Sequence, residues 1–113
     1  MNRWEGSGRL VSVNCRYTQR GKACCWACIA AQDDQDRIDY IDLVAWDDLG
    51  ERLRDFGTVG DRIEITGKLH RRSYTTAAGT QQYKTEVVAD SIGFIDRAPA
   101  KTAQAIKEGK SDG

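Results

Sequence analysis

The 113-residue chain has no long apolar run, no excess of either charge and only one histidine. A membrane-spanning helix needs about 18 or more consecutive apolar residues, so the sequence predicts no membrane span. The first residues also lack the apolar stretch of a secretion signal, and we therefore expect a cytoplasmic protein. One histidine and no phosphate-cradling glycine loop leave no recognisable catalytic set. We expect a protein that is not an enzyme and that uses no cofactor.

The charge of the chain is balanced, with 17 basic and 17 acidic side chains. Many nucleic-acid-binding domains carry a strong positive excess, which attracts the phosphate backbone. If this chain binds nucleic acid, its positive charge must therefore be gathered locally.

The four cysteines fall between residues 15 and 28, and Cys25 and Cys28 have the spacing of zinc ligands. They lie in an apolar run that is typical of a strand, where residues three apart face opposite sides. No second pair follows, so the sequence predicts no metal site. We expect the cysteines to be small hydrophobic residues, since a disulfide is uncommon in a reducing cytosol.

The hydrophobic period divides the chain into strands and one helix. Alternation predicts five strands, at residues 9–15, 23–31, 38–46, 61–74 and 82–90. Between the third and fourth, Leu49, Leu53 and Phe56 form a helical stripe that we expect to plug one end of a barrel. This order predicts an all-β fold, a five-stranded OB-fold barrel with one short helix between strands 3 and 4. We expect the domain to span residues 1–96 and a flexible tail to follow at 97–113.

The third strand carries aromatic residues on the face that turns away from its core. Ile41, Leu43 and Ala45 point one way, whereas Tyr40 and Trp46 point the other. Exposed aromatic rings beside basic side chains suit stacking on nucleic-acid bases.

Two further assignments concern the core. In the fourth strand, Ile63, Ile65, Gly67 and Leu69 are expected to face the core. Trp26, which lies in the cysteine-rich second strand, is interpreted as a core residue.

Several motifs occur in the order found in one known family. They are Gly8-Arg9-Leu10, the aromatic-x-x-x-Val-x-aromatic pattern at residues 40–46, the Gly-Asp-x-Ile-x-Ile-x-Gly-x-Leu pattern at 60–69, and Thr-Glu-Val-Val-Ala at 85–89. In this order and spacing, the chain resembles the bacterial and phage single-stranded-DNA-binding proteins of OB-fold type, over about residues 8–95.

The resemblance implies sequence-independent binding of single-stranded DNA during replication, recombination or repair. It implies base stacking by Tyr40, Trp46 and Tyr74. Phosphate contacts are implied for Arg72, and Lys68, Arg71 and Lys84 are candidates to add to it. It also implies a homo-oligomer, either a tetramer or a dimer.

The chain departs from the family pattern at several positions. Asp42, Asp48 and Val59 stand where basic residues are usual, and the loop at residues 32–37 lacks the family's additional aromatic. Each lost phosphate contact weakens binding, so we expect lower affinity than is typical. The acidic C-terminal tip is missing, so recruitment of replication proteins through a tail is not supported. A protein-interaction OB module, or a primosome-accessory or RNA-binding one, is the alternative interpretation.

Overall fold

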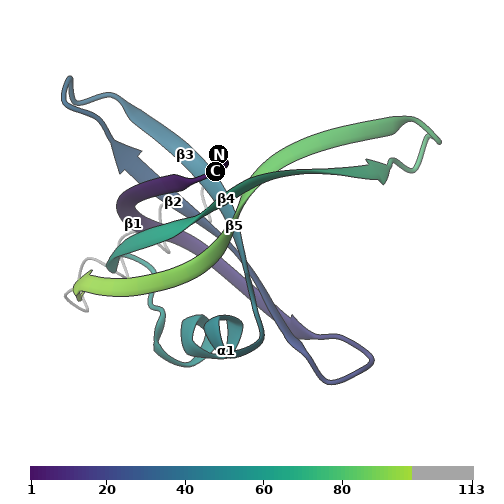
Figure 1. Cartoon of the computed structure of the whole chain (residues 1–113), viewed down its shortest axis with the longest axis horizontal. Coiled ribbons are helices and arrows are strands. Elements are labelled where there is room, and N and C mark those ends of the chain that lie inside the picture. The colour runs from purple at the N-terminus through teal and green to yellow at the C-terminus, as the bar shows by residue number, and fades with distance from the viewer. Residues whose placement is uncertain (98–113) are drawn as a thin grey trace, which may run out of the picture.

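The computed structural model describes residues 1–97, so residues 98–113 of the expected tail lie outside the described part. Five strands close into a barrel in the order β1-β2-β3-β5-β4, with one helix between β3 and β4 (Figure 1). The elements are β1 (Trp4–Tyr17), β2 (Ala23–Gln32), β3 (Ile38–Trp46), α1 (Asp47–Phe56), β4 (Arg62–Thr75) and β5 (Gln81–Asp96). The predicted fold class, an OB-fold barrel, is confirmed.

β1 begins five residues earlier than predicted and has two different neighbours. Its first half pairs with β4 from Trp4 to Arg9, and its second half pairs with β2 from Arg9 to Tyr17. Gly8 lies where the strand crosses from one neighbour to the other, and a Cβ there would collide with the carbonyl oxygen of Ala30. The early start was missed because glycine, serine and glutamate interrupt the apolar alternation before Leu10.

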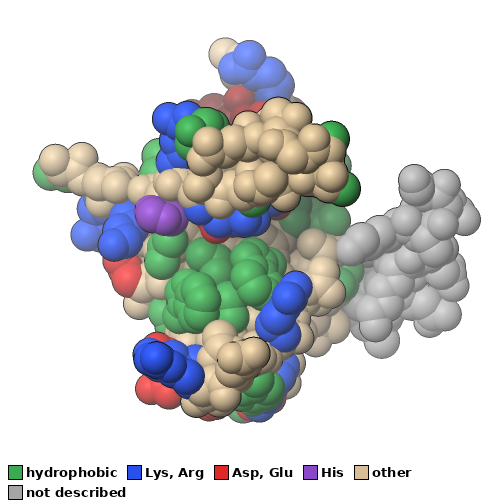
Figure 2. All heavy atoms as spheres, turned by 90° about the vertical axis from the view of Figure 1, so that its right-hand side faces the viewer, with side chains coloured by type: hydrophobic (Ala, Val, Ile, Leu, Met, Phe, Trp, Pro, Cys, Tyr) green, Lys and Arg blue, Asp and Glu red, His purple; other side chains and the backbone are tan. Residues whose placement is uncertain are grey.

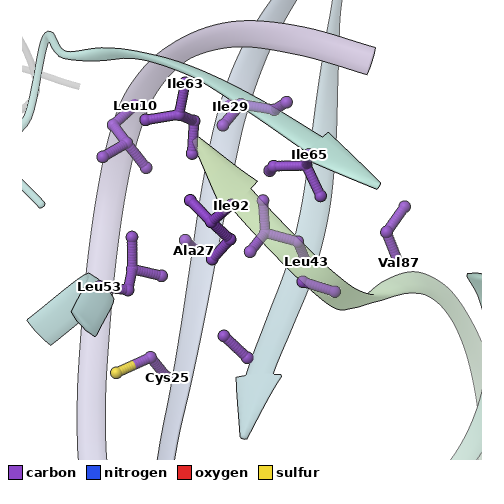
Figure 3. Close-up of a cluster of buried hydrophobic side chains, with 12 residues drawn as sticks. Leu10, Cys25, Ala27, Ile29, Leu43, Leu53, Ile63, Ile65, Val87 and Ile92 are labelled. Atoms are coloured by element: carbon purple, nitrogen blue, oxygen red, sulfur yellow. The ribbon is translucent and has the colours of Figure 1, made fainter. Parts of the chain in front are cut away.

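The core is a single cluster of buried side chains inside the barrel (Figure 3). Its members come from all five strands and the helix: Leu10, Cys25, Ala27, Ile29, Leu43, Ala45, Leu53, Ile63, Ile65, Val87, Ala89 and Ile92. The members from β3 and from the first half of β4 are residues that alternation predicts to face inward. The opposite side chains of β3 are thereby directed away from the core.

The helix closes one end of the barrel, but not with all of its predicted stripe. Leu53 is fully buried and Leu49 packs against the core, whereas Phe56 is 59% exposed. Phe56 ends the helix, where Gly57 donates its N–H to the carbonyl of Leu53 at 2.9 Å. The prediction that Phe56 helps to plug the barrel is therefore wrong. No helix among residues 1–97 has the length and apolar character needed to cross a membrane.

The helix begins directly after β3. Trp46 occupies the N-cap position, without a side-chain hydrogen bond to the helix. Asp47 and Asp48 lie in the first turn, where the helix dipole favours acidic residues.

β4 and β5 continue beyond the barrel as a long hairpin (Figure 1). A shift in their register falls between Thr66 and Gly67, and Leu69 beyond it is 46% exposed. The prediction that Leu69 faces the core is thus wrong, because the strand is leaving the barrel at this point. Asn2 binds this position through both of its side-chain polar atoms, donating to the Leu69 carbonyl at 2.8 Å and accepting its N–H at 3.0 Å.

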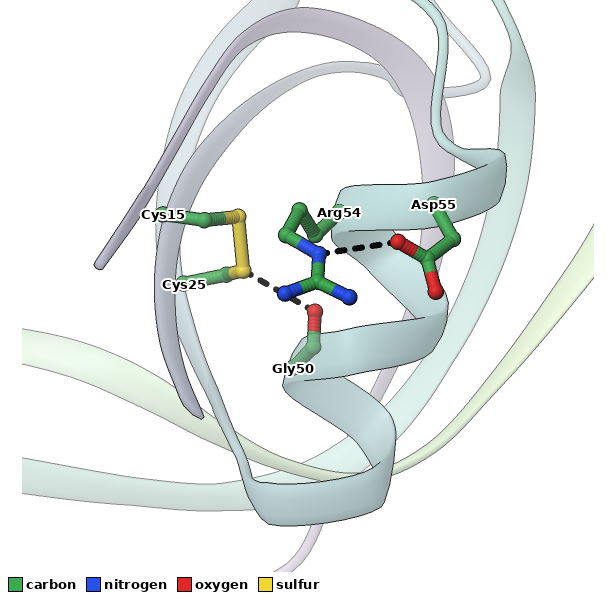
Figure 4. Close-up of a disulfide and its surroundings, with 5 residues drawn as sticks. All are labelled: Cys15, Cys25, Gly50, Arg54 and Asp55. Carbon is green, nitrogen blue, oxygen red and sulfur yellow. Dashed lines mark hydrogen bonds and ion pairs between the residues drawn. A yellow bond between two sulfur atoms is a disulfide. The ribbon is translucent and has the colours of Figure 1, made fainter. Parts of the chain in front are cut away.

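A disulfide joins Cys15 and Cys25, which lie directly opposite each other in β1 and β2 (Figure 4). Cys24 and Cys28 are not part of this disulfide. The expectation that all four cysteines are unpaired small hydrophobes is therefore wrong for this pair. Cys25 Sγ also lies 2.9 Å from the carbonyl oxygen of Gly50 in α1. Because a disulfide sulfur carries no proton, only the reduced thiol could donate a hydrogen bond there.

Reduction of this disulfide is expected to lower the free energy of unfolding by about 2–3 kcal/mol. The cross-link closes a short loop, since the two cysteines are 10 residues apart, and it restricts the unfolded chain accordingly. Urea unfolding with and without a strong reductant measures the difference. A Cys15→Ser variant should match the reduced protein and should not respond to reductant. Equal stability of the oxidised and reduced proteins would contradict the expectation.

Candidate nucleic-acid interface

The side chains that turn away from the core on β2, β3, β4 and β5 form one continuous surface, here called the outer face. Part of it is a hollow of about 370 Å³, lined by Trp26, Val44, Trp46, Lys68, His70, Arg72, Glu86 and Val88. Figure 2 shows hydrophobic side chains gathered in a recess beneath the projecting hairpin, with basic side chains around it. The outer face thus combines an apolar floor with a cationic rim.

The two aromatic residues predicted on β3 lie on the outer face and are accessible. Tyr40 is 67% exposed and Trp46 is 44% exposed. They lie six residues apart on one strand, a distance of about 20 Å at the usual rise per residue. Their rings are therefore available to two separate parts of an extended ligand.

Four of the other predicted site residues lie on one side of the hairpin. Lys68, Arg72 and Tyr74 alternate along one side of β4, and Lys84 lies opposite Arg72 on β5. Tyr74 is 44% exposed, and the guanidinium of Arg72 lies 5.6 Å from its ring centroid.

Arg71 is not brought together with these residues. By alternation it projects from the other side of the hairpin, where its guanidinium lies 3.8 Å from the ring centroid of Tyr83. The structure therefore gathers Tyr40, Trp46, Tyr74, Arg72, Lys68 and Lys84 on the outer face and leaves Arg71 on the opposite one.

Two of the basic residues on the outer face are already paired with acids. Arg72 Nε donates to Oε1 of Glu86 at 2.9 Å, and the Glu86 side chain is only 4% exposed. Lys84 Nζ lies 3.4 Å from Oδ2 of Asp42. Lys68 forms no ion pair within residues 1–97. Local acids thus offset part of the positive charge that phosphate would otherwise meet.

Trp26 lies on the outer face and not in the core, so its interpretation as a core residue is wrong. It is half-buried and pairs with Val44 of β3 on one side and Asn14 of β1 on the other. Small residues fill both phases of β2, so the sequence alone did not reveal that Cys25, Ala27 and Ile29 supply its core positions and that Trp26 has the opposite phase.

A second hollow, of about 650 Å³, adjoins Trp26 on the side of β1. It is lined by Asn14, Cys15, Arg16, Trp26, Arg72 and Lys84. The guanidinium of Arg16 lies 4.8 Å from the ring centroid of Trp26, within the range of a cation–π contact. Trp26 and Arg72 line both hollows, which makes the recessed surface continuous from β3 to β1.

Cys24 has the outward phase of β2 but is buried. Burial raises the pKa of Cys24 above its ordinary value, and the opposing influence of nearby Arg16 is smaller. Cys24 lies directly opposite Trp46 in the β2–β3 ladder. Among residues 1–97, no three histidine, cysteine or acidic side chains are grouped so that they could hold a metal ion.

Comparison with known proteins places this geometry in a family. Residues 1–95 match the model of the Single-strand binding protein family. Single-stranded DNA-binding protein 1 of Streptococcus pyogenes is 35% identical over 97 residues, which cover 80% of this chain and 75% of that protein. The Single-stranded DNA-binding protein of Thermotoga maritima is 32% identical over 110 residues, covering 89% and 78%. That of Clostridium tetani is 35% identical over 66 residues, covering 58% and 46%.

The family model spans nearly all of the described barrel, from before β1 into the last residues of β5. The aromatic and basic residues of the outer face lie within that span. The chain belongs to the Single-strand binding protein family.

Proposed function

We propose that the outer face binds single-stranded DNA without regard to base order and protects it during replication, recombination or repair. The observation that carries the proposal is the exposed Trp46 ring in one hollow with Lys68 and Arg72. An aromatic ring offers a stacking surface to any base, and adjacent cations hold the phosphates on either side. Membership of the family supports this assignment.

In this proposal the aromatic residues supply most of the affinity. Stacking contributes about 1–3 kcal/mol per base and does not depend on base identity, because every base has a flat face. Tyr40 and Trp46 would hold bases along β3, and Tyr74 would hold one near the end of the hairpin. No bond is made or broken, so the proposed function is binding alone, by a cytoplasmic domain of residues 1–96.

The cations set the salt dependence of binding. Lys68 can contact phosphate directly, whereas Arg72 and Lys84 must do so beside Glu86 and Asp42. Each phosphate neutralised adds about 0.7 to the slope of log affinity against log salt for a single strand. We infer a shallow slope and modest affinity, in keeping with the balanced charge of the chain.

Asp42 on the outer face repels phosphate, and it therefore also favours a second candidate function, the docking of a protein partner. Salt-sensitive binding to oligo(dT), with quenching of tryptophan fluorescence, tests the primary proposal. Stronger binding to oligo(U) than to oligo(dT) would favour an RNA-binding module. Failure to bind either polymer at low salt would favour a protein-interaction module.

We also infer that the chain forms a homo-oligomer, either a tetramer or a dimer. Each half of β1 pairs with only one neighbour, which leaves backbone groups along the other edge of that half open for pairing with a second copy. Apolar side chains away from the hollows are exposed as well, among them Ile38 and Ile95. Sedimentation equilibrium of the full chain should give a mass of two or four chains, and a monomer at all concentrations would contradict the inference.

Substitution of Trp46 by alanine is expected to weaken oligo(dT) binding by about 1–3 kcal/mol, because one stacking surface is lost. Phe56→Ala is the matched control, since Phe56 is an exposed aromatic outside both hollows. Anisotropy of a labelled oligonucleotide measures both affinities, and thermal melts establish that the variants are folded. An unchanged affinity in a folded Trp46→Ala protein would remove this residue from the interface.

Substitution of Asp42 by asparagine is expected to strengthen binding. The change removes the acid that pairs with Lys84, so Lys84 becomes free to contact phosphate and the slope of log affinity against log salt steepens by up to about 0.7. Asp39→Asn is the control, because it makes the same chemical change on the same strand but away from the Lys84 pair. Equal affinity and slope in the two variants would show that Lys84 does not reach the DNA.

A further inference from the structure

Trp26 is the one large side chain in the middle of a strand otherwise built from small residues and Ile29. A tryptophan placed only for packing would be expected among the core residues, but Trp26 lies outside the buried cluster and is only partly buried. Its partners across the ladder, Asn14 and Val44, are both smaller. The residues directly opposite it therefore leave the ring partly accessible, and the guanidinium of Arg16 on β1 lies 4.8 Å from the ring centroid.

The position of Trp26 joins the two hollows of the outer face. On the β3 side it shares a hollow with Trp46. The two residues occupy diagonal positions of the β2–β3 ladder, whose backbones lie about 7–8 Å apart. On the β1 side it shares the second hollow with Arg16 and Lys84. A ligand that extends from Trp46 toward β1 must therefore pass over Trp26.

The positive charge beside Trp26 is more available to phosphate than that of Arg72 or Lys84. Arg16 lies within cation–π distance of the Trp26 ring and forms no ion pair among residues 1–97. Arg72 and Lys84, by contrast, each have an acidic partner. A guanidinium can contact a phosphate through two parallel N–H groups, or stack on a base as an aromatic ring does.

We propose that Trp26 and Arg16 form an additional nucleotide subsite, in which Trp26 stacks on one base of the single strand and Arg16 holds the adjoining phosphate. This inference rests on the proposed function, and it extends the DNA path from Trp46 across β2 to β1. Four or more nucleotides are then engaged by stacking, at Tyr40, Trp46, Tyr74 and Trp26. The ring can stack on any base, since every base has a flat face.

The first experiment leaves Trp26 as the only tryptophan, so that tryptophan fluorescence reports on this residue alone. The chain contains three tryptophans, so the double variant Trp4→Phe/Trp46→Phe leaves Trp26 alone while keeping a ring at residue 46. Oligo(dT) carrying a label is titrated in, with label anisotropy reporting binding and tryptophan emission reporting contact at Trp26. Quenching that follows the binding curve is expected. Binding without any change in Trp26 emission would overturn the subsite and leave the proposed function intact.

The second experiment measures affinity in the protein that retains Trp46. Trp26→Leu should weaken binding about 5- to 100-fold, and Trp26→Phe should recover most of the loss because it restores a ring. A loss in Trp26→Leu that Trp26→Phe does not recover would indicate a packing role and overturn the proposal. If the unmodified protein fails to bind oligo(dT) at all, the proposed function fails together with the subsite.

The third experiment tests the phosphate contact proposed for Arg16. Arg16→Gln should lower affinity and reduce the slope of log affinity against log salt by about 0.7, the contribution of one phosphate contact. Arg62→Gln is the matched control, because Arg62 is exposed but lines neither hollow. Identical slopes for the two variants would overturn the role assigned to Arg16.

Discussion

Closure of the barrel is the constraint on which the outer face depends. β1 pairs with β2 along one half and with β4 along the other, and β3 meets β5 in a short parallel contact at Leu43 and Val44. Once the ring is closed, one side of every strand must face the common core. The other side is then exposed as a set, so residues from β2, β3, β4 and β5 form one surface although they are distant in the sequence.

This constraint also explains how a chain without net charge can present a site for a polyanion. Within the outer face, Lys68, Arg72 and Lys84 are gathered by the β4–β5 hairpin. Glu86 and Asp42 then offset part of the positive charge of Arg72 and Lys84, respectively. A buried carboxylate such as Glu86 needs its cationic partner, so Arg72 is partly committed to holding the fold. Lys84 and Asp42 are both more exposed, and their pairing costs little to break in favour of phosphate.

Much of this arrangement was predictable from the sequence, because hydrophobic period is a local property. Alternation located β3 at its exact bounds and assigned Tyr40 and Trp46 to the outward side, and the helical stripe identified α1. The errors fall where the chain leaves the regular barrel. β1 begins in polar residues whose strand structure depends on β4, and Leu69 follows a register shift that no local pattern reveals. Phe56 has the right helical phase but lies at the helix end, past the core it was expected to fill.

The cysteine-rich strand shows a different limit of sequence reasoning. Its run of small residues obscures the alternation, since Cys24 on the outer face is as buried as Cys25 in the core. The phase becomes visible only through partners: Cys25 is cross-linked to Cys15, which fixes the register of β2 against β1 and directs the next residue outward. That residue is Trp26. The same pairing that places Cys25 beside the helix therefore places an aromatic ring between Arg16 and Trp46, within the surface proposed to bind single-stranded DNA.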